Sequence, residues 1–164
     1  MRENILNLPP LFFRGCDNCT KCCDGTKFFL APLILDDFDK VKSYFEIRAI
    51  ILDNVIPVML FNDGNSPCKY LKNNKCEIYE NRPPACKIYP FSPYYDKIFI
   101  DLECDAVGYK GEKLPSNKCE LFNSKFFDER LIDFIEKREK TIKYMKKQTL
   151  YFDKEIKGIK LYKF

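Results

Sequence analysis

The clearest periodic pattern of apolar positions lies near the end of the chain, over residues 124–150. Asp128 and Glu129 stand near its start, where a helix dipole favours negative charge, and lysines crowd its second half. The apolar positions are Phe127, Leu131, Phe134, Ile135, Ile142 and Met145. This pattern predicts a long amphipathic helix.

Three shorter patterns precede it. Residues 32–45 carry apolar side chains near helical spacing after Pro32, which suits a first helical turn, and so predict a short helix. Residues 50–61 are rich in Ile, Val and Leu and predict two short strands or one bent strand. Residues 97–103 alternate between two faces, which predicts a strand that delivers Cys104 to its end.

A hairpin is expected over residues 68–79, with Asn73 and Asn74 as its turn. If the loop has two residues, strand parity would place Cys68 and Cys76 on opposite faces. Either the loop is longer or these two thiols serve different sites.

The remaining cysteine-bearing segments have no helix or strand period. Residues 12–25 predict a tight irregular loop, and residues 82–86, with two adjacent prolines, predict a stiff extended segment that aims Cys86 at a site. We therefore expect an α+β fold in a single domain over residues 1–164. It would be a small, irregular, metal-nucleated domain with short strands, one short helix in the N-terminal half and a long C-terminal helix.

Composition narrows the chemistry. The chain of 164 residues has nine cysteines and no histidine. The missing imidazole excludes serine-histidine and cysteine-histidine catalysis and mixed cysteine-histidine zinc sites. Thiolate is a soft ligand, so zinc or iron-sulfur chemistry is indicated rather than magnesium or calcium. No nucleotide-binding glycine motif is present.

The cellular compartment is inferred from the lack of a signal peptide and of a long apolar segment. Residues 1–15 lack the features of a signal peptide, and the longest apolar stretch, residues 47–61, is interrupted by polar residues and proline. We expect a cytoplasmic protein with no membrane segment. Cytosolic thiols rarely form stable disulfides, so nine cysteines favour metal binding, although intracellular disulfides in hyperthermophiles keep a disulfide framework open.

The first four cysteines are the densest group. Cys16, Cys19 and Cys22 follow one another at intervals of three, the spacing with which ferredoxin loops wrap one cubane cluster. Cys23 is awkward for the same site because neighbouring side chains usually diverge. It would reach a second metal or replace Cys22.

The later cysteines complete the predicted ligand set. Cys68, Cys76, Cys86 and Cys104 bring the number to eight, enough for two all-cysteine sites, and Cys119 is left over. Four lysines adjoin these cysteines and would favour thiolate: Lys21, Lys69, Lys75 and Lys87. Eight thiolates would take the formal net charge from +4 to about −4, which two divalent centres would restore to near neutrality.

At these residues the chain resembles the YkgJ-like cysteine-cluster family, which is described as carrying a zinc- or iron-chelating domain. The resemblance rests on Cys16-x-x-Cys19-x-x-Cys22-Cys23, on Cys76-Glu-Ile-Tyr79-Glu-Asn-Arg82-Pro83-Pro-Ala-Cys86-Lys-Ile-Tyr89-Pro90-Phe91, and on Cys68 and Cys104. It covers residues 12–110 and implies metal binding through eight cysteines, without a settled reaction. Flagellin lysine N-methylases carry similar clusters. Lys87 stands where the family often has Arg, and the C-terminal helix lies outside the shared pattern.

Arg82 and Tyr79 are candidates for tuning the metal. Their guanidinium and phenol groups could donate hydrogen bonds to sulfur and so shift its charge or redox potential. Equally, Arg82 could bond backbone carbonyls around the proline turn and Tyr79 could be a core residue. Tyr89 to Phe91 is interpreted as packing.

The favoured function is an iron-sulfur protein with a [4Fe-4S] cluster in electron transfer or as the redox component of a larger enzyme. A structural zinc module that binds a partner is the alternative, and an accessory component of a methyltransferase or maturation enzyme is the second. We expect a protein redox partner or a larger complex. The helix lysines are interpreted as a solvated face rather than a nucleic-acid site.

Overall fold

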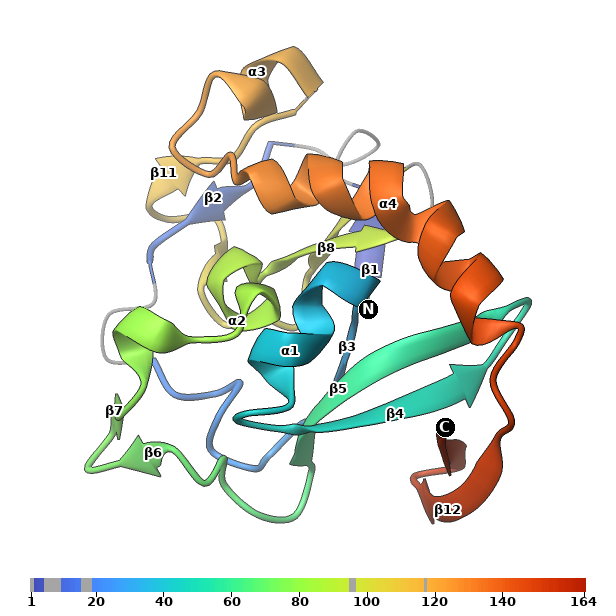
Figure 1. The fold of residues 1–164 in the computed structure, drawn as a ribbon. Helices are drawn as coiled ribbons and strands as arrows, with labels where there is room; N and C mark the ends of the chain where they lie inside the picture. Colours follow the sequence, from blue (N-terminus) through green and yellow to red (C-terminus); the bar gives the residue numbers. More distant parts are fainter. Residues whose placement is uncertain (1, 5–9, 16–18, 95–96, 117) are drawn as a thin grey trace.

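The computed structural model describes residues 2–4, 10–15, 19–94, 97–116 and 118–164. The fold is α+β, as the sequence predicts: short helices and small sheets lie beside one larger sheet, and the long helix α4 (Glu129–Met145) runs along the molecule (Figure 1). The other helices are η2 (Leu35–Asp37), α1 (Phe38–Val41), η3 (Tyr79–Asn81), α2 (Pro84–Ile88) and α3 (Lys118–Phe122).

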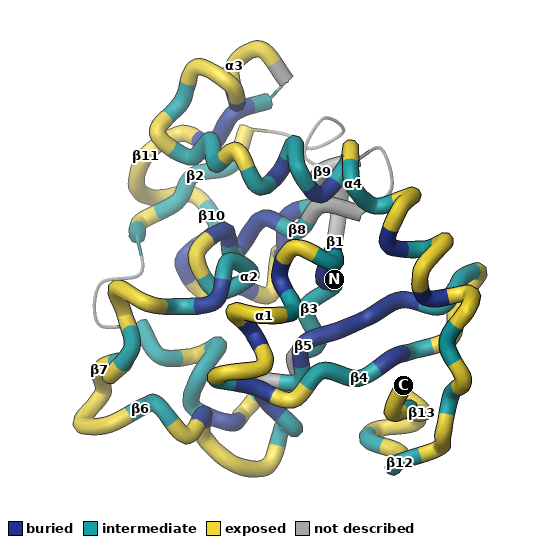
Figure 2. The backbone as a smooth tube through the Cα atoms, viewed as in Figure 1, coloured by how far each residue is buried: buried dark blue, intermediate teal, exposed yellow. Residues whose placement is uncertain are grey.

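The larger sheet has five antiparallel strands in the order β12-β13-β4-β5-β3. Its strands are β3 (Phe28–Pro32), β4 (Glu46–Ile51), β5 (Val55–Asp63), β12 (Tyr151–Ile156) and β13 (Ile159–Lys163). Of the alternatives predicted over residues 50–61, two strands are found, but β4 begins earlier and β5 ends later than expected. They pair from Glu46 opposite Leu60 to Ile51 opposite Val55. Four consecutive β5 residues, 56–59, are buried, so this strand is covered on both faces (Figure 2).

The predicted helix over residues 124–150 begins later and ends earlier than expected. The Asp128 carboxylate accepts a hydrogen bond from the Arg130 backbone N–H at 2.8 Å, which caps the first turn and sets the start at Glu129. The helix predicted over residues 32–45 is shorter still, because only η2 and α1 are helical there. None of the helices in the described part of the chain has both the length and the apolar character needed to cross a bilayer.

The predicted hairpin is confirmed. Strands β6 (Leu71–Lys72) and β7 (Lys75–Cys76) pair with Leu71 opposite Cys76, and Asn73 and Asn74 adopt the positive φ values of 48° and 58° that a two-residue turn requires. The parity argument about Cys68 does not apply, since Cys68 lies before β6, outside the ladder.

The segment expected to be extended at residues 82–86 is instead partly helical. Pro83 is extended, with φ −53° and ψ 147°, and serves as the N-cap of α2, which places Pro84 in the first turn. A proline is well accommodated there because the N–H that it lacks would have no intrahelical partner. Cys86 is therefore presented from a helix.

Small sheets complete the fold. The strand predicted over residues 97–103 is β9 (Lys97–Asp101), and Cys104 follows it after a turn. It pairs with β1 (Arg2–Asn4) and β8 (Phe91–Tyr94), while β2 (Phe12–Phe13) pairs with β10 (Val107–Gly108) and β11 (Glu112–Lys113). The hairpin of β12 and β13, which turns at Lys157 and Gly158 with φ values of 49° and 79°, was not predicted.

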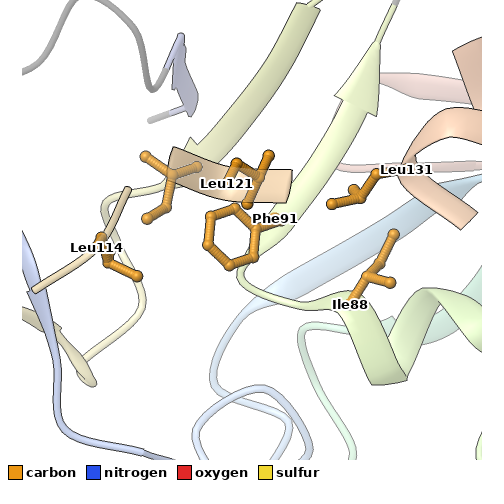
Figure 3. Close-up of a cluster of buried hydrophobic side chains, with 6 residues drawn as sticks. Ile88, Phe91, Leu114, Leu121 and Leu131 are labelled. Carbon is orange, nitrogen blue, oxygen red and sulfur yellow. The ribbon is translucent and has the colours of Figure 1, made fainter. Parts of the chain in front are cut away.

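Two hydrophobic cores hold these parts together. The α4 core consists of Ile88, Phe91, Ile100, Leu114, Leu121 and Leu131 (Figure 3). The sheet core consists of Leu33, Val41, Phe45, Met59 and Cys68, with Cys23 and Cys86 packed against it. The first core is built from hydrocarbon side chains, whereas the second includes sulfur.

Candidate metal centre

Seven of the eight predicted ligands line one cavity of about 660 Å³, which we call the cysteine cavity. Cys16, the eighth, lies outside the described residues. The cysteines in the lining come from a loop, a turn, β7, α2 and the turn after β9: Cys19, Cys22, Cys23, Cys68, Cys76, Cys86 and Cys104. Elements far apart in the sequence thus bring these thiols to a common space.

Backbone contacts fix the cysteine loop. The Cys23 N–H donates to the Thr20 carbonyl at 2.7 Å, and the Cys68 N–H donates to the Cys23 carbonyl at 2.7 Å, which joins the two cysteine-bearing segments directly. Gly25, at φ +86°, permits this approach: a Cβ there would lie 2.5 Å from the Ser66 carbonyl carbon. Only glycine leaves space for the two segments to meet.

The adjacent thiols of Cys22 and Cys23 converge, contrary to the expectation that they would diverge. Their Sγ atoms are 3.6 Å apart. Two thiolates on one tetrahedral zinc ion lie about 3.8 Å apart, given a Zn–S distance of about 2.3 Å. The tight turn at residues 20–24 aims both side chains into the same space, so this pair can contact one metal.

Burial governs the charge of the thiols. It raises the pKa of Cys86 to about 12, with further increases from Cys22 and Cys68 and an opposing effect from Arg82. Burial also raises the pKa of Cys68 and of Cys104. Lys69 lowers the pKa of Cys68, but this effect is smaller than that of burial. Without a metal these thiols stay protonated at neutral pH, and the lysines alone do not create thiolates.

The thiols of the described residues line the cavity without meeting at one point. The pKa of Cys104 responds to Cys19 and Cys22, whereas the pKa of Cys68 responds to Cys76 and Cys22. Among the described residues, no three cysteine or carboxylate side chains lie close enough together to hold a single metal ion. Cys22 affects the pKa of both Cys104 and Cys68, so it lies between the pair Cys19 and Cys104 and the pair Cys68 and Cys76.

The chain belongs to the CxxCxxCC family. The family model, described as "putative zinc- or iron-chelating domain", matches residues 15–156, which is most of the chain. No curated protein and no solved structure matches the chain. The match extends beyond residues 12–110, so it includes α4, which the sequence resemblance had left outside the shared pattern. Zinc or iron chelation is the activity that membership supports.

In this CxxCxxCC domain, Arg82 and Tyr79 contact each other. The Arg82 Nε–H donates to the Tyr79 carbonyl at 2.8 Å, and the guanidinium carbon lies 3.6 Å from the centre of the Tyr79 ring. The Tyr79 residue is 51% exposed, so it is not a core residue. Within the described part of the chain, neither side chain hydrogen-bonds to sulfur. The positive charge of Arg82 instead lowers the pKa of Cys86, against the larger effect of burial.

Sequence reasoning missed the role of Tyr89. Its phenol O–H donates to Asp101 Oδ2 at 3.1 Å, and the same hydroxyl lies beside Cys104, where it partly opposes the rise that burial causes in the pKa of that thiol. The buried Asp101 also accepts the Glu103 N–H at 3.0 Å and thereby holds the turn before Cys104. No sequence signal could indicate this contact, because it depends on how β8 and β9 pair.

Cys119 does not line the cavity. It lies on α3 and is exposed, with the Asn123 side-chain amide 3.7 Å from its sulfur. The structure therefore separates the leftover cysteine from the seven that line the cysteine cavity.

Proposed function

We propose that the CxxCxxCC domain binds a [4Fe-4S] cluster in the cysteine cavity and serves in electron transfer. One observation carries this proposal: seven thiols surround a cavity of about 660 Å³, and no three of the described ligand side chains converge on one ion. A [4Fe-4S] cluster takes four thiolates, one on each iron, so its ligands stand apart around a shared body, and the remaining cysteines are enough for a second all-cysteine site. A single ion requires them to converge.

The other cavity residues suit a redox centre. Phe45, Phe126 and Phe134 contribute aromatic walls that limit the access of water. Lys75 and Arg82 bring positive charge to the lining, and the charge of Arg82 opposes the effect of burial on the pKa of Cys86. When bound, the cluster supplies one-electron redox chemistry, with a potential set by burial, charge and hydrogen bonds to sulfur.

The experiment is anaerobic purification followed by iron, sulfide and zinc analysis and visible spectroscopy. We expect brown protein that bleaches with dithionite. The Cys86→Ser variant should lose iron, and the matched Cys119→Ser variant should retain it, because Cys86 lines the cavity and Cys119 does not. Colourless protein with zinc and no iron would overturn the proposal.

A structural zinc site is the second candidate, and one observation favours it. The Cys22 and Cys23 Sγ atoms are 3.6 Å apart, close to the spacing of two thiolates on one zinc ion. In that case the purified protein should be colourless, and its zinc content should be close to two ions per chain with all eight predicted ligands in use. A cytoplasmic location and a protein redox partner remain predictions.

A further inference from the structure

The positive charge of the protein is concentrated at one end of the chain. Residues 140–164 contain eight lysines and two carboxylates, a net charge of +6. The whole chain carries +4, so residues 1–139 carry −2. The structure brings the end of α4 and the β12–β13 hairpin to the same end of the molecule (Figure 1). A charge asymmetry of this size is typical of proteins that bind polyanions.

Aromatic rings run through the same region. The aromatic row consists of Phe38, Tyr144, Phe152, Tyr162 and Phe164. Phe38 joins α4 to the C-terminus, because its ring centre lies 6.4 Å from that of Tyr144 and 5.9 Å from that of Phe164. The Phe152 and Tyr162 rings, which belong to paired strands, are 6.1 Å apart.

Several of these rings are open to solvent. Phe152 is 62% exposed, and Tyr144 and Phe164 are also exposed. Tyr162 pairs directly with Phe152, so both side chains lie on one face of the hairpin, and Phe164 follows directly after the end of β13. The rings thus form two contacting groups, one around Phe38 and one on the hairpin, which meet in the chain at the end of β13.

Lysines border this row. Lys143 precedes Tyr144 on the last turn of α4, Lys147 follows Tyr144 by three residues just after the helix end, and Lys160 lies on the same strand face as Tyr162. All three are exposed. Within the described residues these three lysines make no ion pair, unlike Lys154 and Lys163, which pair with Glu46 and Asp153. Their charge is available to a partner.

We propose that the aromatic row and its bordering lysines bind single-stranded nucleic acid, which replaces the sequence interpretation of the helix lysines as a solvated face because exposed rings lie in the same region. Bases would stack on the exposed rings of Tyr144, Phe152 and Phe164, and phosphates would contact Lys143, Lys147 and Lys160. A membrane is disfavoured because the hairpin tip is Lys157 and Gly158 rather than an apolar wedge. The proposal does not depend on the metal in the cysteine cavity.

The test is fluorescence anisotropy of the full metal-loaded protein with labelled oligouridylate and oligothymidylate of about twelve nucleotides. Binding should weaken as salt rises. Phe152→Ala should weaken binding about tenfold, because base stacking on one ring contributes that much. The double variant Lys143→Glu and Lys147→Glu should lower the slope of log affinity against log salt by about 1.4, for two lost phosphate contacts.

The chain offers matched controls. Tyr151 is as exposed as Phe152, at 64% against 62%, but its side chain points to the opposite face of β12. Tyr151→Ala and Lys72→Glu, on the distant β6, should leave binding unchanged. Metal content and the unfolding midpoint are measured for every variant, so that a folding defect is distinguished from lost binding.

Three outcomes would overturn the proposal: no binding of either oligonucleotide at low salt, equal losses for Phe152→Ala and Tyr151→Ala, or binding to phosphatidylserine vesicles without oligonucleotide binding. The last result would assign the surface to anionic lipid instead.

Discussion

The five-stranded sheet with α4 and the cysteine-bearing region are stabilised in different ways. In the first, strands of five to nine residues form a continuous ladder, and the helix buries Leu131 and Phe134. In the second, most elements have two to five residues, and Cys23, Cys68 and Cys86 from this region pack against the sheet core with sulfur in place of hydrocarbon. The strand ladder and the apolar side chains of Leu33, Val41 and Met59 can hold most of the first region. The second depends on what its thiols bind.

Removing the metal should cause the largest difference in stability between the two regions. A strong chelator should lower the free energy of unfolding by about 4 kcal/mol, the contribution of a ligand present at a thousand times its Kd. Hydrogen exchange should then accelerate at Cys23 and Cys68 while β4 and β5 stay protected. Unchanged unfolding of metal-free protein, measured in urea, would contradict this division.

Breaking the buried ion pair between η2 and α4, beside the cysteine cavity, should have the next largest effect. Asp37, 1% exposed, accepts from both terminal nitrogens of Arg130, one of them at 2.6 Å, and Arg130 lines the cysteine cavity. Asp37→Asn leaves the guanidinium without its countercharge and should cost about 3 kcal/mol.

The neighbouring carboxylate supplies the control for this variant. Asp36 pairs with Lys137 at 2.8 Å, but both side chains are exposed. Asp36→Asn should therefore leave the urea midpoint almost unchanged. Equal effects at residues 36 and 37 would show that burial of the Asp37 pair is unimportant.

Raising the pH should lower the stability of the metal-free protein but should raise its affinity for metal. The pKa of Cys86 is raised from 9.0 to about 12, so in metal-free protein its contribution to stability is complete below pH 9 and is lost as pH rises towards 12. With metal, each bound thiolate releases a proton, and affinity should rise with pH near neutrality by up to about tenfold per unit for each proton. Competition with a chelator at several pH values measures the second effect.

Removing the hydroxyl group of Tyr89 should have the smallest effect on stability. Tyr89→Phe removes the hydrogen bond to Asp101 and the contact with Cys104, and should cost about 1 kcal/mol of stability. If the cavity holds a cluster, its reduction potential should also shift, which a purely structural role would not cause. Tyr109→Phe, at a residue that is 91% exposed, should change neither quantity.

Sequence reasoning succeeded where the signal was local. Asn73 and Asn74 predicted the hairpin because these side chains tolerate positive φ, and the period of residues 124–150 predicted α4. It failed at α2, where two prolines suggested extended backbone although the second begins a helix. It also failed for the β12–β13 hairpin, whose mixture of charged and apolar residues follows neither period clearly.

The candidate metal centre was also predictable only where the signal was local. Spacing identified the cysteines, but the convergence of Cys22 and Cys23 depends on a turn closed by Thr20, and the contact of Tyr89 with Asp101 depends on strand pairing. Both features come from long-range or conformational details that residue type alone does not encode.

The order of strands in the large sheet also bears on where this domain can be cut. The family match ends at residue 156, at the last residue of β12, yet β13 is inserted between β12 and β4. A chain ended at residue 156 would lose Leu161, which is fully buried, and would leave β12 with no neighbouring strand. The boundary of sequence similarity is therefore not a boundary of folding, and any transplanted version of the domain must include β13.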